Sequence, residues 1–120
     1  MSISVRVVDS TSGCSVAELA VTLHARENGA WPVVARARTD SAGSIASLSG
    51  RALPRGSYRL VFDTGAYFAE RAVDSLYAEV IVSVHYQGDP GHLHVPLLLS
   101  PFAYTTYRGL APKAVAAEQT

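Results

Sequence analysis

The sequence predicts a single all-β domain, a sandwich of two sheets with one short helix. A chain of 120 residues has room for one hydrophobic core. Along most of it apolar and polar residues alternate with a period of two, which is typical of strands with one buried face. Clusters of Gly, Pro, Asn and Asp separate these segments at the spacing of a compact sandwich.

The first half of the chain contains three alternating segments, at residues 3–7, 19–24 and 31–38. Pro32 lacks a backbone N–H, so we expect the third segment to begin at a sheet edge. The side chains expected to face the core are Ile3, Val5, Val7, Leu19, Val21, Leu23, Trp31, Val33, Ala35 and Ala37.

The second half continues with strands expected at residues 58–63 and 79–85, whose inward side chains are Tyr58, Leu60, Phe62, Val80, Val82 and Val84. A turn at Asp89-Pro90-Gly91 leads into residues 93–99, and we predict that the strands on either side of it form a long hairpin. Between the strands, Phe68, Ala72 and Leu76 are spaced by four, which predicts a short amphipathic helix there.

The segment 93–99 is apolar on both of its faces. Leu93, Val95, Leu97 and Leu99 alternate with Pro96 and Leu98. A two-sheet sandwich covers only one face of a strand, so a second copy of the chain is the expected cover for the other.

Composition narrows the classes of partner. Ten basic and ten acidic side chains give no net charge, which disfavours nucleic-acid binding, and no apolar run is long enough to span a membrane. The start of the chain does not resemble a signal peptide, and Cys14 is the only cysteine, so we expect a cytoplasmic location and no disulfide. We expect the domain to occupy residues 1–110, followed by a frayed tail at 111–120.

Three strings carry a family resemblance. They are Tyr-Arg-Leu-Val-Phe-Asp-Thr-Gly-Ala-Tyr-Phe at 58–68, His-Leu-His-Val-Pro-Leu-Leu-Leu-Ser-Pro at 92–101 and Tyr-Thr-Thr-Tyr-Arg-Gly at 104–109. With them the chain resembles the 5-hydroxyisourate hydrolase family, the enzymatic branch of the transthyretin-like proteins, from about Val5 to Gly109. The resemblance implies two four-stranded sheets, one short helix, and a homotetramer assembled as a dimer of dimers around a central channel that holds the sites.

The resemblance also implies site residues, several of which differ here. Arg6 stands where the family has a first-strand histidine, and Ser44 stands where it has an arginine after a turn. His94 of the His-Val-Pro string is kept. Tyr107 and Arg108 of the family's terminal tetrapeptide are also kept, but Leu110 replaces its final serine and ten more residues follow. The chain is thus expected to be a divergent member with altered catalytic positions.

We therefore expect a cationic pocket around one group that can move protons near neutral pH. His94 is the expected proton-transfer group, while Arg6 and Arg108 orient an anion and Tyr107 donates a hydrogen bond. Ser44 and Leu110 complete the expected substrate-binding set. No cofactor is expected, and no metal either: His92 and His94 have ligand spacing, but nothing in the sequence makes a third ligand converge on them.

Three functions are compatible with this pocket. The first is a divergent enzyme that opens, closes or hydrolyses a small anionic cyclic or carbonyl compound. The second is a non-catalytic carrier of a small ligand, similar to vertebrate transthyretin. The third is a genuine 5-hydroxyisourate hydrolase with a rearranged site. A small molecule is the expected partner in each.

Overall fold

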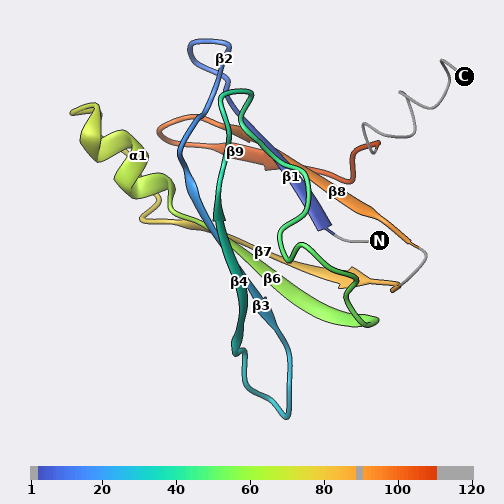
Figure 1. Ribbon diagram of the computed structural model, residues 1–120. Helices are drawn as coiled ribbons and strands as arrows, with labels where there is room; N and C mark the ends of the chain where they lie inside the picture. Colours follow the sequence, from blue (N-terminus) through green and yellow to red (C-terminus); the bar gives the residue numbers. More distant parts are fainter. Residues whose placement is uncertain (1–2, 89–90, 111–120) are drawn as a thin grey trace, which may run out of the picture.

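Two β-sheets packed face to face form the molecule, as the sequence predicts (Figure 1). The computed structural model describes residues 3–88 and 91–110. In chain order the elements are β1 (Ile3–Asp9), β2 (Cys14–Ser15), β3 (Ala20–Ala25), β4 (Val33–Arg38), β5 (Ser44–Ile45), β6 (Gly56–Phe62), α1 (Thr64–Glu70), β7 (Val80–Tyr86), β8 (Leu93–Leu99) and β9 (Tyr104–Thr106).

The first sheet has the strand order β2-β1-β8-β9, and the two-residue strand β5 also pairs with β1. Strands β1 and β8 are parallel, in a register that runs from Ile3 opposite Leu93 to Asp9 opposite Leu99. Residues opposite each other point to the same face of a sheet. The outer face therefore carries Ser4 beside His94 and Arg6 beside Pro96, while the apolar residues between them face the core.

The second sheet is antiparallel, with the order β4-β3-β6-β7. Strand β4 lies at its edge, as Pro32 predicts. Val33 differs from the prediction because the pairing of β3 with β4 shifts between Leu23 and His24. The extra residue of this bulge turns Val34 toward the core and leaves Val33 exposed, the reverse of the simple alternation.

The core lies between the sheets and contains the predicted inward side chains of both except Val33 and Trp31. The guanidinium of Arg59 lies over the Trp31 ring, 3.9 Å from its centroid. The fully buried members of the core include Val5, Val21, Leu60, Phe62 and Leu97. At about 25 cal/mol per Å² of apolar surface removed from water, burial of such residues is the main source of stability for a chain without a disulfide.

The predicted hairpin across residues 89–91 is wrong. Strand β7 pairs with β6 in the second sheet, whereas β8 pairs with β1 and β9 in the first. The connection crosses between the layers because the apolar side of β8 completes the core from the first sheet. The hydroxyl of Tyr86 fixes the end of β7 by donating to the carbonyl of Gly91 at 2.7 Å. Asp89 and Pro90 themselves lie outside the described residues.

The helix is present but begins earlier than the spacing of Phe68, Ala72 and Leu76 predicts. Helix α1 spans Thr64–Glu70, buries Thr64 and Phe68, and leaves Leu76 exposed. The chain cannot continue as a helix because Ala72 adopts a left-handed conformation with φ of 57°. It turns back toward Gly65, whose close approach to the carbonyl of Ala78 leaves no space for a side chain.

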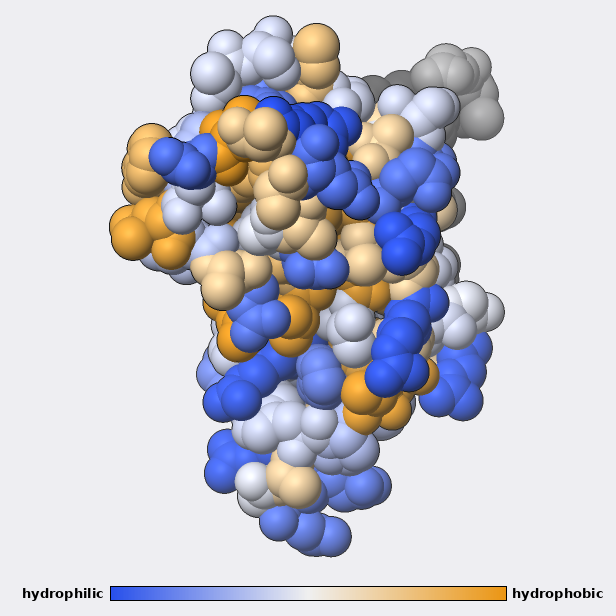
Figure 2. All heavy atoms as spheres, turned by 90° about the vertical axis from the view of Figure 1, so that its left-hand side faces the viewer, coloured by the Kyte–Doolittle hydropathy of each residue, from blue (hydrophilic) through white to orange (hydrophobic). Residues whose placement is uncertain are grey.

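The surface is divided by polarity. Seen from the side of α1, apolar residues gather in the upper part of the molecule, while the lower part, which carries the β3–β4 hairpin, is mostly hydrophilic (Figure 2). Within residues 3–88 and 91–110 no helix combines the length and apolar character needed to cross a bilayer. The predicted tail at 111–120 lies outside the described residues.

Candidate functional site

A depression of about 530 Å³ opens on the outer face of the first sheet. Four residues of the predicted site line it: Arg6 from β1, His94 from β8, and Tyr107 and Leu110 from the segment after β9. The side chains of Val8, Pro96 and Leu98 add apolar surface to the lining, which also includes Gly13, Ser15 and Gly109. The depression therefore combines a guanidinium, an imidazole and a phenol with flat apolar surface.

The β1–β8 register fixes the imidazole of His94. Ser4 lies opposite it, and the Ser4 hydroxyl is 2.7 Å from His94 Nδ1. His94 is 8% exposed. Its Nε2 atom has no hydrogen-bond partner among the described residues, so this nitrogen is available to a molecule in the depression.

Gly109 closes the segment after β9 against this imidazole. Its backbone N–H donates to the carbonyl of His94 at 2.9 Å. A Cβ atom at this position would lie 2.7 Å from Cγ of Pro96 and 2.9 Å from Cδ2 of His94. Only glycine allows the backbone to come this close. This contact brings Tyr107 and Leu110, on either side of Gly109, to the depression.

The charge state of His94 follows from its surroundings. Burial, the neighbouring His92 and the guanidinium of Arg6 all lower the pKa of His94 from its ordinary 6.5, with burial the largest cause. His94 is therefore a neutral imidazole at pH 7, which is the form that accepts a proton. Arg6 remains cationic and exposed, and the single ion pair among residues 3–88 and 91–110 joins Arg71 to Glu70. Arg6 thus has no carboxylate partner in that part of the chain.

Two predicted site residues lie elsewhere in the protomer. Ser44 is opposite Arg6 in the β1–β5 pair, but it does not line the depression, and its backbone N–H donates to Asp40 Oδ1 at 2.9 Å. Arg108 lines a separate hollow of about 50 Å³ together with His85 and His92. The structure thus brings Arg6, His94, Tyr107 and Leu110 together, and leaves Ser44 and Arg108 outside this group.

Sequence reasoning missed Ser4. Its hydroxyl lies 2.7 Å from His94 Nδ1 and 3.0 Å from His92 Nε2. The available signal was its position two residues before Arg6, on the same face of the first strand. Using that signal requires knowing that β1 pairs with β8.

The His92 and His94 pair does not form part of a larger ligand set. Over the described parts of the chain, no three His, Cys, Asp or Glu side chains are placed to hold a metal ion. The two imidazoles instead share the hydroxyl of Ser4.

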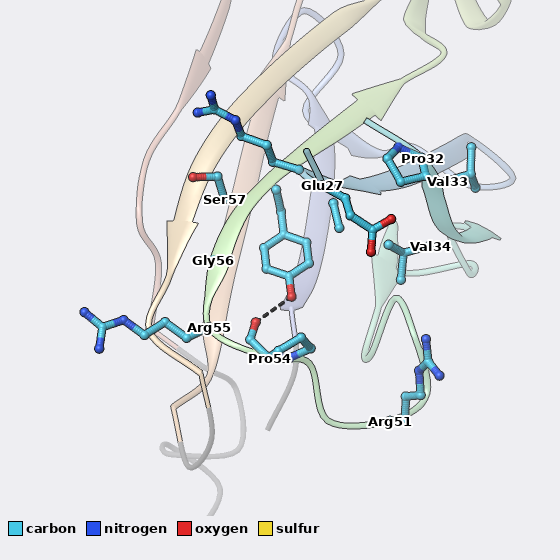
Figure 3. A pocket seen from close by; sticks show the side chains of 12 residues that line it. Glu27, Pro32, Val33, Val34, Arg51, Pro54, Arg55, Gly56 and Ser57 are labelled. Carbon is cyan, nitrogen blue, oxygen red and sulfur yellow. Dashed lines mark hydrogen bonds between the residues drawn. The ribbon is translucent and has the colours of Figure 1, made fainter. Parts of the chain in front are cut away.

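A further hollow of about 360 Å³ lies between the β3–β4 hairpin and the loop before β6 (Figure 3). Arg51, Arg55 and Glu27 line it, but the side chain of Arg55 extends away from the other labelled residues. The phenol of Tyr58 is turned inward and donates to the carbonyl of Pro54. The charged groups of this hollow do not converge on one point, so the depression around His94 is the stronger candidate site.

Comparisons with known proteins agree with this architecture. Residues 3–109 match the Transthyretin group, described as the HIUase/Transthyretin family. A 5-hydroxyisourate hydrolase from Salmonella typhimurium is 35% identical over 108 residues, which cover 89% of this chain and 79% of that protein. The structure of Klebsiella pneumoniae 5-hydroxyisourate hydrolase has a TM-score of 0.82 and 28% identity, and the match covers 92% of this chain and 100% of that one. Sea bream transthyretin in complex with thyroxine has a TM-score of 0.84 and 28% identity, covering 93% and 98%.

Proposed function

Because the chain belongs to the HIUase/Transthyretin family, we propose that it is a divergent 5-hydroxyisourate hydrolase-like enzyme. Its substrate is a small anionic cyclic or carbonyl compound, and its chemistry is acid/base catalysis. One observation carries the proposal: the neutral imidazole of His94, held at Nδ1 by Ser4, lines the same depression as the guanidinium of Arg6. That guanidinium forms no ion pair with a carboxylate among the described residues.

Arg6 and the apolar surface of the depression account for binding. A guanidinium cannot act as a base at neutral pH, but it can donate two parallel hydrogen bonds to a carboxylate or enolate. Pro96 and Leu98 present apolar surface to the face of a planar ring, and about 530 Å³ is ample for a small heterocycle. Tyr107, which is 54% exposed, supplies a hydroxyl at the rim.

His94 accounts for the chemistry. In hydrolysis of a cyclic amide, Nε2 accepts a proton from water while the water oxygen bonds to the carbonyl carbon. The oxyanion that forms is stabilised by hydrogen bonds from the Arg6 guanidinium and the Tyr107 hydroxyl. When the ring C–N bond breaks, the proton on Nε2 passes to the leaving nitrogen, and the sum of the steps is addition of one water.

The site is proposed to be completed by a second copy in a dimer of dimers. Leu98, Tyr107 and Leu110 are exposed around the depression, and Leu110 is 82% exposed. Leu98→Asp is expected to lower the mass seen by analytical ultracentrifugation, whereas Arg36→Asp on the outer face of the second sheet is expected to leave it unchanged. Wild-type protomers that sediment alone would refute the shared site.

The enzymatic proposal is tested by product formation. Purified protein is incubated with freshly generated 5-hydroxyisourate and with a panel of anionic cyclic ureides and lactams, and ring opening is followed by ultraviolet absorbance and NMR. Turnover of one of these compounds above its uncatalysed rate is the expected result. Absence of turnover over the whole panel would refute the proposal.

Two alternatives are decided by the same samples. A carrier of a small ligand is favoured by the open, partly apolar depression and by the likeness to a thyroxine-bound transthyretin. Binding measured by calorimetry, with no product after a long incubation, would establish this function. Identity of 35% to a 5-hydroxyisourate hydrolase favours that reaction itself. Acceleration confined to 5-hydroxyisourate would establish this third function.

A further inference from the structure

We propose that the buried hydroxyl of Ser4 carries protons between His94 and His92, so that Nε2 of His94 alternates between base and acid. This inference rests on the proposed function for its place in a catalytic cycle. Ser4 is a positioning residue in this scheme, because it acts on the substrate only through His94.

The geometry places one hydroxyl between two imidazoles. Ser4 Oγ lies 2.7 Å from His94 Nδ1 and 3.0 Å from His92 Nε2, both within hydrogen-bond range. Ser4 is 3% exposed, so solvent has little access to its hydroxyl. His92 and His94 are two residues apart in the chain, and Ser4 lies opposite His94 in the parallel pair.

A hydroxyl has a single proton, which allows two arrangements of these bonds. In the first, Ser4 donates to His92 and accepts from Nδ1–H of His94, which leaves the Nε2 lone pair of His94 free to act as a base. In the second, Ser4 donates to Nδ1 of His94 and accepts from Nε2–H of His92, and Nε2 of His94 then carries a proton. The tautomer of His94 is therefore coupled to that of His92.

One proton taken up at Nε2 of His94 converts the first arrangement into the second. The Nδ1–H bond of His94 breaks as a new O–H bond forms on Ser4, and the original Ser4 proton moves to Nε2 of His92. His94 is then neutral with its proton on Nε2, and the positive charge is on His92. When Nε2 gives its proton to a leaving nitrogen, the transfers reverse: His92 returns its proton to Ser4 as Ser4 returns one to Nδ1 of His94, which restores the first arrangement.

A second cavity borders His92, which holds the extra proton while the relay is in the second arrangement. His92 lines the hollow of about 50 Å³ that also contains His85 and Arg108, which is large enough for a water molecule. The Arg108 guanidinium disfavours a lasting positive charge there. On the other side, Arg6 and Tyr107 are the charged and titratable groups that line the depression with His94.

The test combines three variants with two readouts. Ser4→Ala removes the hydroxyl, and Ser4→Thr keeps one. Ser10→Ala is a matched control because the Ser10 hydroxyl donates to the carbonyl of Leu99 and has no hydrogen bond to a histidine among the described residues. Two-bond ¹H–¹⁵N NMR spectra give the tautomer and titration of each ring. The turnover number and KM are measured on the substrate found for the wild type.

The wild type and Ser10→Ala are expected to show His92 and His94 titrating as a coupled pair with linked tautomers. Ser4→Ala should uncouple the two rings and lower kcat by about tenfold or more at unchanged KM, and Ser4→Thr should restore both. Unchanged tautomers and titrations in Ser4→Ala would overturn the relay whatever the turnover. Uncoupling by Ser4→Ala in a protein that turns over no substrate would support the relay and refute only the proposed enzymatic function.

Discussion

Replacing Gly109 with alanine tests how tightly the segment after β9 closes on the imidazole of His94. The added methyl would lie 2.7 Å from Cγ of Pro96, roughly 0.7 Å nearer than the 3.4 Å at which ordinary contact begins, and 2.9 Å from Cδ2 of His94. Both neighbours are rings on β8, so neither can swing away as a long side chain would. The segment or the imidazole must move by a distance of that order.

The expected cost has two parts. Overpacking of this kind destabilises a fold by about 1–3 kcal/mol, which urea unfolding followed by circular dichroism will measure. A displacement approaching 1 Å at a catalytic group costs on the order of 10²-fold in rate, which kcat/KM will measure.

Gly56→Ala is the matched control for this experiment. Gly56 begins β6, has a backbone conformation open to any residue, and has nothing within 4 Å of an added Cβ. We expect its stability and kcat/KM to stay close to wild type. If Gly109→Ala also behaves as wild type, the close packing of Gly109 against His94 is not part of the working site.

Three further predictions follow from buried groups. Burial, His92 and Arg6 lower the pKa of His94, so kcat/KM should stay constant as the pH falls to 6.5, the ordinary pKa of histidine, and decline only below it. Arg6→Gln removes one of these causes and should move the decline to higher pH. An unchanged pH–rate profile in this variant would contradict the role of Arg6. Tyr67→Phe removes a hydrogen bond of 2.9 Å to the carboxylate of Asp9 and should cost about 1–3 kcal/mol in urea unfolding, while no loss would show that water replaces the phenol. Leu97→Ala opens a cavity at a fully buried position and should cost about 2–5 kcal/mol in the same assay, with a smaller loss indicating that the core collapses around it.

Alternation along the strands predicted the sandwich because the period of two reports directly which side chains are buried. Leu60, Phe62 and Leu97 all face the core as expected. Alternation says nothing about which strands pair, and this is why the connection from β7 to β8 was predicted as a hairpin rather than a crossing between sheets. The bulge that turns Val34 inward is also a property of the pairing.

The candidate site was predictable where a residue's role depends on its own strand. Arg6 stands on the polar face of its strand, His94 stands on the face of its strand opposite Val95 and Leu97, and the structure places both at one depression. Ser4 was missed because a small hydroxyl gains its role only from the strand beside it. Arg108 was expected beside them, but its contacts are set by the register of the segment after β9, which directs it to the neighbouring hollow.

The central claim is that the neutral imidazole of His94 transfers the proton in the reaction, and the most direct test compares wild type with His94→Ala on one substrate. The account predicts that kcat/KM falls by at least about 10²-fold while far-ultraviolet circular dichroism stays unchanged. Equal kcat/KM for the two folded proteins would contradict it.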